Sequence, residues 1–275
     1  MAGKQLQLDL TDEVVVITGG GGVLCGTMAA ALGARGAAVA VLDVAAEAAS
    51  RVAREVEAAG SKALALPCDV LERDQLRDAA DAVQCELGAP TTLISGAGGN
   101  RPEATTGPAR SFFDLPIEAV RWVFDLNFIG TFLASQVFGR IMAEHRRGNI
   151  INISSMNAAR PLTRIPAYSA AKSAVSNFTQ WLAVHMNQEY GPEVRVNAIA
   201  PGFFLTEQNR FLLMDRESGE LTPRGRTIID HTPAGRFGNP EDLIGTVLWL
   251  ISDSSQFVNG VVVPVDGGFS AFSGV

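Results

Sequence analysis

The chain has 275 residues, and 47 % of them are hydrophobic, which is enough apolar material for one large α/β domain or two small ones. The formal net charge is -7 without a Lys/Arg-rich block, so nucleic-acid and anionic-membrane partners are not expected. The three cysteines lack C-x-x-C spacing, the histidines lack ligand spacing, and neither a signal peptide nor a long apolar run is visible. We therefore expect a cytoplasmic protein without a metal site.

Short apolar runs alternate along the chain with segments of helical periodicity. The apolar runs predict seven strands: Val14–Thr18, Ala38–Asp43, Ala63–Pro67, Thr92–Ser95, Asn149–Ser154, Arg195–Ala200 and Val261–Val265. A helix opens near Val23, and the other helical segments are Glu47–Ala59, Arg73–Leu87, Glu118–Glu144, Ala167–Tyr190 and Pro240–Ser252. Unbroken apolar strands alternating with helices indicate a mainly parallel sheet covered on both faces. We predict one doubly wound, Rossmann-type α/β domain over residues 1–275.

Residues 202–239 do not fit this alternation. The segment is long, contains Pro223, Pro233 and several glycines, and has a weak helical signal. A connection of this length inside a compact domain is usually a lid or a binding loop. We expect it to be a substrate lid.

The segment ITGGGGVLCG (residues 17–26) follows the first predicted strand and opens a helix. A pyrophosphate binds where backbone N–H groups point out of a helix N-terminus, which makes Gly19, Gly22, Val23 and Leu24 candidate cofactor residues. Asp43 closes the second strand, where a carboxylate can bind the adenosine ribose of NAD and repel the 2′-phosphate of NADP. Either feature alone has an ordinary structural explanation, but together they predict an NAD(H) site.

The segment YSAAK opens a long helix and places Tyr168 and Lys172 on one helix face. A nearby ammonium favours the phenolate, so we expect it to lower the pKa of Tyr168. Ser155 follows a predicted strand, where its hydroxyl can bond the carbonyl that Tyr168 protonates, and Asn127 lies on the preceding helix. A lone Y-x-x-x-K is often only a solvated helix face, but the serine at this spacing favours a catalytic site.

With these motifs the chain resembles the short-chain dehydrogenase/reductase family over essentially its whole length. The resemblance implies that Tyr168 is the general acid/base and that Lys172 tunes it while binding the nicotinamide ribose. It also implies that Ser155 orients the carbonyl and that Asn127 holds a water of the proton relay. The matching pieces are TGGGGVLCG, CDV, SGAG, Asn127, Ser155, YSAAK, PGFFLT and VDGG. The further cofactor contacts that it implies are Asp69, Val70, Ser95, Gly96, Ala97, Pro201, Gly202, Phe204 and Thr206.

Two stretches depart from the family pattern. The loop usually reads T-G-x-x-x-G-x-G, and Val23 and Cys25 stand at its second and third glycines, while Ser95 and Gly96 replace two asparagines of N-N-A-G. We expect the loop still to bind, because N–H groups hold a pyrophosphate and Gly22 can adopt a positive φ that Val23 cannot. Cys25 is small enough for close helix–sheet packing, and an oxidisable thiol is the alternative interpretation.

Longer stretches, among them NISSMNAARPLTRIPAYSAAK and HTPAGRFGNPEDL, resemble the D-mannonate oxidoreductase (fructuronate reductase) branch of the family. This resemblance implies a sugar-acid substrate, D-fructuronate or D-mannonate. For such a substrate we predict that Asn157 holds a hydroxyl and Arg164 the carboxylate, with Arg160 as the other candidate clamp.

Two alternatives stay open: a family member acting on a gluconate-type, polyol or 3-ketoacyl substrate, and a non-catalytic nucleotide-sensing module. The sensing module would be expected to have lost Ser155, Tyr168 or Lys172, and all three are present. The resemblance also implies a homotetramer, formed through the predicted helices Glu118–Glu144 and Ala167–Tyr190 and the apolar tail Phe269–Val275.

Overall fold

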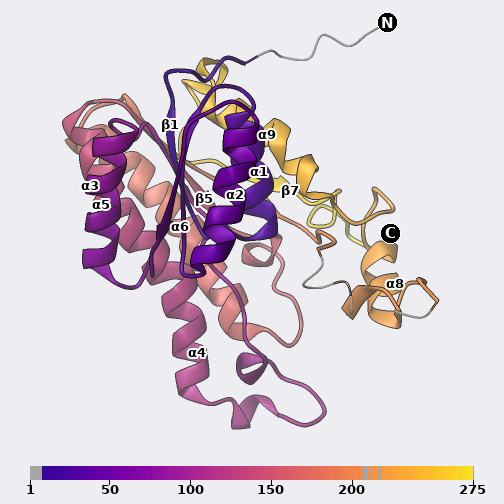
Figure 1. Ribbon diagram of the computed structural model, residues 1–275. Coiled ribbons are helices and arrows are strands. Elements are labelled where there is room, and N and C mark those ends of the chain that lie inside the picture. The colour runs from indigo at the N-terminus through magenta and orange to yellow at the C-terminus, as the bar shows by residue number, and fades with distance from the viewer. Residues whose placement is uncertain (1–7, 207–209, 211, 216–217, 275) are drawn as a thin grey trace, which may run out of the picture.

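A seven-stranded parallel sheet in the order β3-β2-β1-β4-β5-β6-β7 forms the centre of the computed structural model (Figure 1). The structure describes residues 8–274 apart from 207–209, 211 and 216–217. The strands are β1 (Val14–Thr18), β2 (Ala38–Asp43), β3 (Ala63–Pro67), β4 (Thr92–Ser95), β5 (Gly148–Ile153), β6 (Val194–Pro201) and β7 (Val262–Val265). All seven predicted strands are therefore confirmed, each with its ends within one residue of the prediction.

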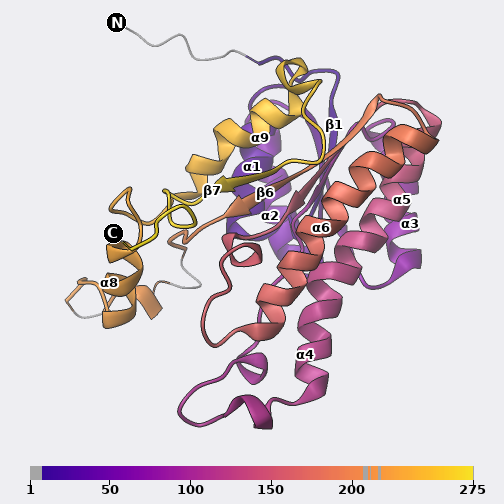
Figure 2. The ribbon, with the colours of Figure 1, turned by 180° about the vertical axis from the view of Figure 1, so that it is seen from behind.

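Helices cover both faces of this sheet, which confirms the predicted doubly wound α/β fold (Figures 1 and 2). One face carries α1 (Val23–Gly33), α2 (Ala46–Ala58) and α9 (Ile244–Ile251), and the other carries α3 (Arg73–Glu86), α5 (Gly130–Glu144) and α6 (Pro166–Glu189). Within the described ranges, no helix combines the length and the apolar character that crossing a membrane requires.

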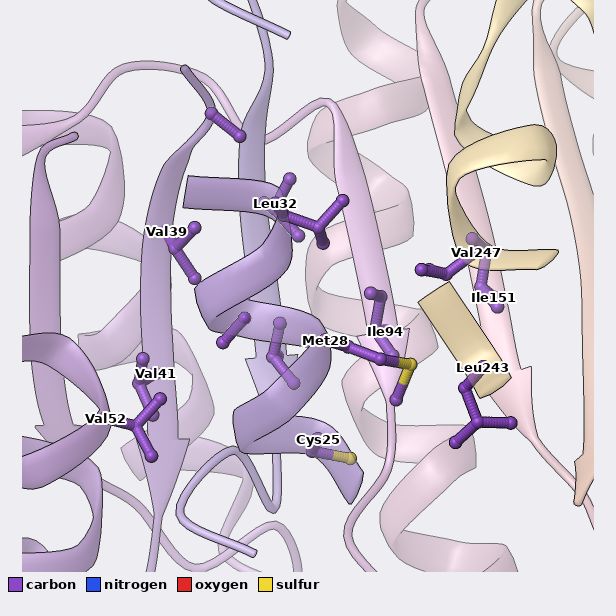
Figure 3. Packing of buried hydrophobic residues seen from close by; sticks show 14 of the residues in the cluster. Cys25, Met28, Leu32, Val39, Val41, Val52, Ile94, Ile151, Leu243 and Val247 are labelled. Carbon is purple, nitrogen blue, oxygen red and sulfur yellow. The ribbon is translucent and has the colours of Figure 1, made fainter. Parts of the chain in front are cut away.

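Each face of the sheet has its own apolar layer. Cys25, Met28 and Leu32 of α1 share one side of the helix and pack toward β2 and β4 through Val41 and Ile94 (Figure 3). Every one of these side chains is at least nine-tenths buried. Burying a side chain of this size stabilises the fold by about 1.5–3 kcal/mol, so the layer fixes α1 against the sheet.

The order of the strands changes direction between β1 and β4. These two strands are neighbours with Thr18 level with Ser95, although two strands separate them in the chain. The loops that follow them therefore leave the same edge of the sheet in opposite directions. In open α/β sheets, the crevice that binds a ligand lies at this edge.

The predicted continuous helix Glu118–Glu144 is wrong in one respect. The structure divides this segment into α4 (Ile117–Phe124), a π-helical turn (Asp125–Ile129) and α5. A π-helical turn leaves a backbone carbonyl without its usual donor, and here the Asn127 side-chain amide donates to the Val123 carbonyl at 2.7 Å. The amide thus stabilises the irregular turn in which it lies. Pro240–Ser252 is likewise divided, into a 3₁₀ turn (Pro240–Leu243) and α9.

The predicted lid, residues 202–239, lies partly outside the described residues, at 207–209, 211 and 216–217. Its described part contains α8 (Pro223–Asp230), where the Thr222 hydroxyl caps the helix by accepting from the Gly225 N–H at 3.0 Å. An isolated bridge joins Phe204 to Gly238 and so closes the two ends of the segment. Its role as a lid stays a prediction.

Candidate active site

The loop between β1 and α1 ends in an uncapped helix N-terminus. Gly22 is the N-cap, no side chain caps the helix, and its first turn contains no acidic residue. In the part of the chain that the structure describes, the N–H groups of Val23, Leu24 and Cys25 donate to no protein acceptor. Free N–H groups at the positive end of a helix dipole attract an anion, so a pyrophosphate fits this loop with Val23 in place.

The positive φ of the loop is at Gly19 (64°), whereas Gly22 has an ordinary φ of -71°. The expectation that Gly22 supplies this freedom is therefore wrong. A second constraint also requires glycine at position 19, because a Cβ at this position would lie 2.7 Å from the Ala97 Cα.

Asp43 lies at the end of β2 and holds the glycine loop directly. Its Oδ2 accepts from the Gly21 N–H at 3.0 Å and its Oδ1 from the Ala45 N–H at 2.9 Å. The carboxylate therefore stands fixed at the position predicted to contact the adenosine ribose.

Arg51 of α2 also reaches the loop, and the sequence analysis missed it. Its Nη2 donates to the Gly21 carbonyl at 2.9 Å, while its Nη1 pairs with Glu55 at 2.8 Å. The sequence held no local signal for this contact, because it depends on the close approach of Ala48, which lies one turn before Arg51 and whose Cβ would be 2.6 Å from a Cβ on Gly21.

Ser155, Tyr168 and Lys172 meet beyond the carboxyl end of β5. Ser155 is buried, and its hydroxyl lies near enough to the Tyr168 phenol to affect the pKa of that phenol. The Lys172 Nζ lies 5.7 Å from the centre of the Tyr168 ring and donates to the Ile153 carbonyl at 2.7 Å. The helix that carries Tyr168 and Lys172 is bound to β5 by Asn152, whose Nδ2 donates to the Thr179 hydroxyl at 2.9 Å. The three side chains are therefore held by two rigid elements.

Burial dominates the ionisation of this group. It raises the pKa of Tyr168 above its ordinary value, and the nearby Ser155 hydroxyl offsets only part of the effect. Burial also lowers the pKa of Lys172 to about 8. The expectation of a lowered pKa for Tyr168 is thus wrong for this structure, because desolvation is the largest contribution. The phenol is protonated and ready to donate.

Asn127 is fully buried and ties two segments together. Its Nδ2 donates to the Gly99 carbonyl at 2.7 Å as well as to Val123, and its Oδ1 accepts from the Gly99 N–H at 3.1 Å. A Cβ on Gly98 would lie 2.5 Å from this Oδ1 and 3.2 Å from the Lys172 Nζ, so both atoms border the same point. Only Oδ1 keeps a lone pair for a water.

The other predicted cofactor residues lie along the same edge of the sheet. The Ser95 Oγ at the end of β4 is buried without a partner, and Gly96 and Ala97 donate their N–H groups to the Thr18 hydroxyl. Asp69 and Val70 follow β3, Pro201 ends β6, and Gly202 and Thr206 follow it. Phe204 is buried with its ring against Gly238, so its side chain belongs to the core.

The predicted substrate residues follow Ser155. Asn157 is 4 % exposed, and its backbone N–H donates to the Ser155 hydroxyl at 3.3 Å. No described residue provides a hydrogen-bond partner for its Oδ1. The exposed Arg164 has a positive φ of 75°, and its carbonyl accepts from the Thr106 N–H at 2.8 Å. Among the described residues no acceptor binds its guanidinium. Arg160, by contrast, donates to the Ser270 carbonyl at 3.0 Å.

Cys25 is buried, and burial raises the pKa of its thiol to about 12. A neutral, enclosed thiol is a poor nucleophile, which favours packing over the oxidisable-thiol alternative. Across the described residues, no group of three or more His, Cys, Asp or Glu side chains is arranged to hold a metal ion.

Comparison with known proteins agrees with this geometry. Residues 24–270 match the profile of the family described as "Enoyl-(Acyl carrier protein) reductase". A Bacillus subtilis (strain 168) protein named "Uncharacterized oxidoreductase UxuB" is 50 % identical over 279 residues, which cover 98 % of this chain and 99 % of the relative. A Haemophilus influenza protein, provisionally described as a D-mannonate oxidoreductase, has a crystal structure with bound NAD. That structure has a TM-score of 0.90 and 47 % identity, and the match covers 97 % of this chain and 98 % of that chain.

More distant relatives differ in the substrates that their names state. The 5-keto-D-gluconate 5-reductase of Escherichia coli (strain K12) is 31 % identical over 94 % of this chain and 96 % of its own length. The 7alpha-hydroxysteroid dehydrogenase of the same strain is 30 % identical over 95 % of both chains. Likeness at this level therefore does not choose between a sugar acid and a steroid.

We predict that the protein binds NADH at least about tenfold more tightly than NADPH, a difference of about 1.4 kcal/mol, because Asp43 repels a 2′-phosphate. Fluorescence titration of both cofactors measures the ratio. In Asp43→Ala the preference for NADH over NADPH should decrease, because the Asp43 carboxylate no longer repels the 2′-phosphate and the Arg51 guanidinium can attract it. The control Asp43→Ala/Arg51→Ala should lose any gain in NADPH affinity. Equal affinities in the unaltered protein would contradict the prediction.

Proposed function

The chain belongs to the short-chain dehydrogenase/reductase family and is an NAD-dependent oxidoreductase, and from that premise we propose that it interconverts a keto-sugar acid and its hydroxy acid. D-Fructuronate and D-mannonate are the pair that we would test first, as the provisional description of the Haemophilus influenza protein suggests. The observation that carries the proposal is the buried, unpartnered Oδ1 of Asn157 next to Ser155.

In the proposed reaction Tyr168 donates its phenolic proton to the carbonyl oxygen of the substrate. Ser155, whose hydroxyl lies near the phenol, binds the same oxygen and fixes its position. The Lys172 ammonium stabilises the phenolate that remains, and the free lone pair of the Asn127 Oδ1 holds a water that returns the proton. When NADH is bound, it supplies the two electrons and the hydrogen that the carbonyl carbon accepts.

The residues that we propose for NAD(H) are those of the carboxyl edge of the sheet. The N–H groups of Val23 and Leu24 would bind the pyrophosphate and Asp43 the adenosine ribose, with Asp69 and Val70 beside the adenine. Lys172 would bind the nicotinamide ribose, and the backbone from Pro201 to Thr206 would border the nicotinamide.

A polar substrate suits the segment between Ser155 and Tyr168. An unpartnered buried amide oxygen loses hydrogen-bonding energy unless a ligand donates to it, and a sugar hydroxyl is such a donor. Arg164 stands on the same segment with its guanidinium free for a carboxylate, whereas Arg160 is already bonded to Ser270. A steroid or an acyl chain would leave both Asn157 and Arg164 without a partner.

We also propose that residues 1–275 act as one domain, with 202–239 as its lid, and that the protein is a cytoplasmic homotetramer. Support for the assembly comes from the outer face of α5 and α6, where Phe132, Phe178 and Trp181 form a ring ladder that continues to His185 and Tyr190. The Trp181 side chain is 56 % exposed in this chain. An aromatic face of this kind is typical of a subunit interface.

A panel of ketones tests the substrate class. We expect NADH oxidation to be fastest with keto-sugar acids, slower with uncharged keto-sugars, and slowest with 3-ketoacyl and steroid ketones, because only the first group engages both Asn157 and Arg164. The measurement is kcat/KM from the loss of NADH absorbance. A preference for an apolar ketone would contradict the proposal and favour the alternative of a family member that acts on a 3-ketoacyl substrate.

Tyr168→Phe tests the general acid. Removing the hydroxyl should lower kcat by at least about 10²-fold and leave NADH affinity nearly unchanged, because the ring stays and only the proton donor is lost. Steady-state kinetics and a fluorescence titration separate the two effects. Activity within a few-fold of the unaltered protein would exclude this role.

The pH dependence follows from Lys172. Its pKa of about 8 means that the ammonium is present below that pH and is lost as the pH rises through it. Because Tyr168 needs that charge to stabilise the phenolate, kcat/KM for ketone reduction should fall above about pH 8. The fall should move to higher pH in Lys172→Arg, which keeps its charge. The rates are measured at NADH concentrations that saturate the protein at each pH, because Lys172 is also proposed to bind the nicotinamide ribose. A kcat/KM that does not fall above about pH 8 under these conditions would refute the assignment.

Arg164→Met tests the carboxylate clamp. The loss of a hydrogen bond to a charged group should cost about 1.5–3 kcal/mol in kcat/KM for the keto-sugar acid. It should cost little for an uncharged keto-sugar of the same length. Arg160→Met is the matched control, because that guanidinium already binds Ser270, and it should affect the two substrates equally. An equal loss for both substrates in Arg164→Met would show that Arg164 supports the fold instead.

A further inference from the structure

Cys25 and Gly96 share one space inside the molecule. The Cys25 Sγ lies 2.2 Å from the point where a Cβ on Gly96 would be, far inside any allowed contact. The φ of Gly96 is not positive, so its backbone conformation would accept other residues. A Cβ on Gly96 would also lie 3.0 Å from the Thr18 carbonyl oxygen, a tight contact, so the Cys25 Sγ is the larger of two obstacles to a side chain at position 96.

The segment that contains Gly96 lies between the two halves of the site. On one side its N–H donates to the Thr18 carbonyl at 3.1 Å, and Gly19 of the glycine loop approaches so closely that a Cβ there would strike Ala97. On the other side Gly99 exchanges two hydrogen bonds with Asn127. A shift of residues 95–99 would consequently move the glycine loop and Asn127 relative to each other.

We propose that Cys25 is a positioning residue, whose side chain fills the gap in front of Gly96 and thereby sets the distance between the glycine loop and residues 95–99. The two departures from the family pattern are then one matched pair, because a side chain is added at position 25 and removed at position 96. The proposal rests on NAD binding and on no particular substrate.

The Cys25 side chain acts here by its volume. It is 5 % exposed and lies in the first turn of α1, in the apolar layer with Met28 and Ile94 (Figure 3). Its backbone N–H is one of the free N–H groups at the helix N-terminus. Because a packed interior transmits small displacements, loss of the Sγ should let α1 and residues 95–99 settle closer together and move those N–H groups.

Four proteins test the pair: the unaltered chain, Cys25→Ala, Gly96→Ala and Cys25→Ala/Gly96→Ala. We expect Gly96→Ala to weaken NADH binding by at least about tenfold and Cys25→Ala to weaken it by about threefold. The double variant, in which the new methyl group takes the space that the Sγ leaves, should bind NADH more tightly than either single variant, although the Thr18 carbonyl oxygen still lies 3.0 Å from the methyl position. The readouts are the NADH dissociation constant from fluorescence titration and the thermal midpoint.

Two matched controls remove a thiol or add a methyl group elsewhere. Cys85→Ala deletes an exposed thiol, and Gly245→Ala adds a Cβ in α9 where no heavy atom lies within 4 Å. Neither should change NADH affinity. If thermal midpoints fall while NADH affinity stays constant, Cys25 is only a core residue and the proposal is overturned.

The double variant decides the outcome even where Gly96→Ala does not fold. It should then bind NADH more tightly than Cys25→Ala, because its gap is filled. Equal or weaker binding than Cys25→Ala overturns the proposal, as would a Gly96→Ala protein that binds NADH like the unaltered chain. None of these measurements needs a ketone, so a wrong substrate assignment would not affect them.

Discussion

The parallel pairing of β1 with β4 is the constraint on which the rest of the structure depends. It places Thr18 level with Ser95, and the chain leaves these two strands in opposite directions. The glycine loop and residues 95–99 then face each other at the carboxyl edge of the sheet. At the same edge Asp43 ends β2, which pairs with β1, and Ser155 lies just beyond β5, which pairs with β4. Residues far apart in the chain thus form one site without any long connection.

Desolvation determines the chemistry of this edge. A buried Lys172 is less easily protonated than a free lysine, and a buried Tyr168 is less easily ionised than a free tyrosine. Both pKa shifts favour the uncharged form of the side chain, although a lysine with a pKa of about 8 is still mostly protonated at neutral pH. A neutral phenol beside an amine that is protonated at neutral pH suits proton donation to a ketone.

The sequence was sufficient for the strands and for the residues that regular elements carry, because apolar periodicity and the spacing of Tyr168 and Lys172 are local properties. It was insufficient where a non-local contact decides. The Asn127 side chain is held by Gly99, which is 28 residues away, and Arg51 reaches Gly21 across 30 residues. The pKa of Tyr168 depends on burial, which no local pattern records. The error at Gly22 has the same origin, since Ala97 sets the close approach at Gly19.

The residues proposed for catalysis lie on or beside regular elements, whereas those proposed for substrate specificity lie on an irregular segment. Ser155, Tyr168 and Lys172 are fixed by β5 and α6, so they can serve any ketone that reaches them. Asn157 and Arg164 lie on the irregular segment between these elements, where Arg164 keeps a positive φ that costs a non-glycine residue about 1–3 kcal/mol. The hydrogen bond from Thr106 to the Arg164 carbonyl helps to hold that conformation. Because Arg164 is exposed and no acceptor among the described residues binds its guanidinium, this backbone conformation leaves the side chain available for the carboxylate that we propose it binds.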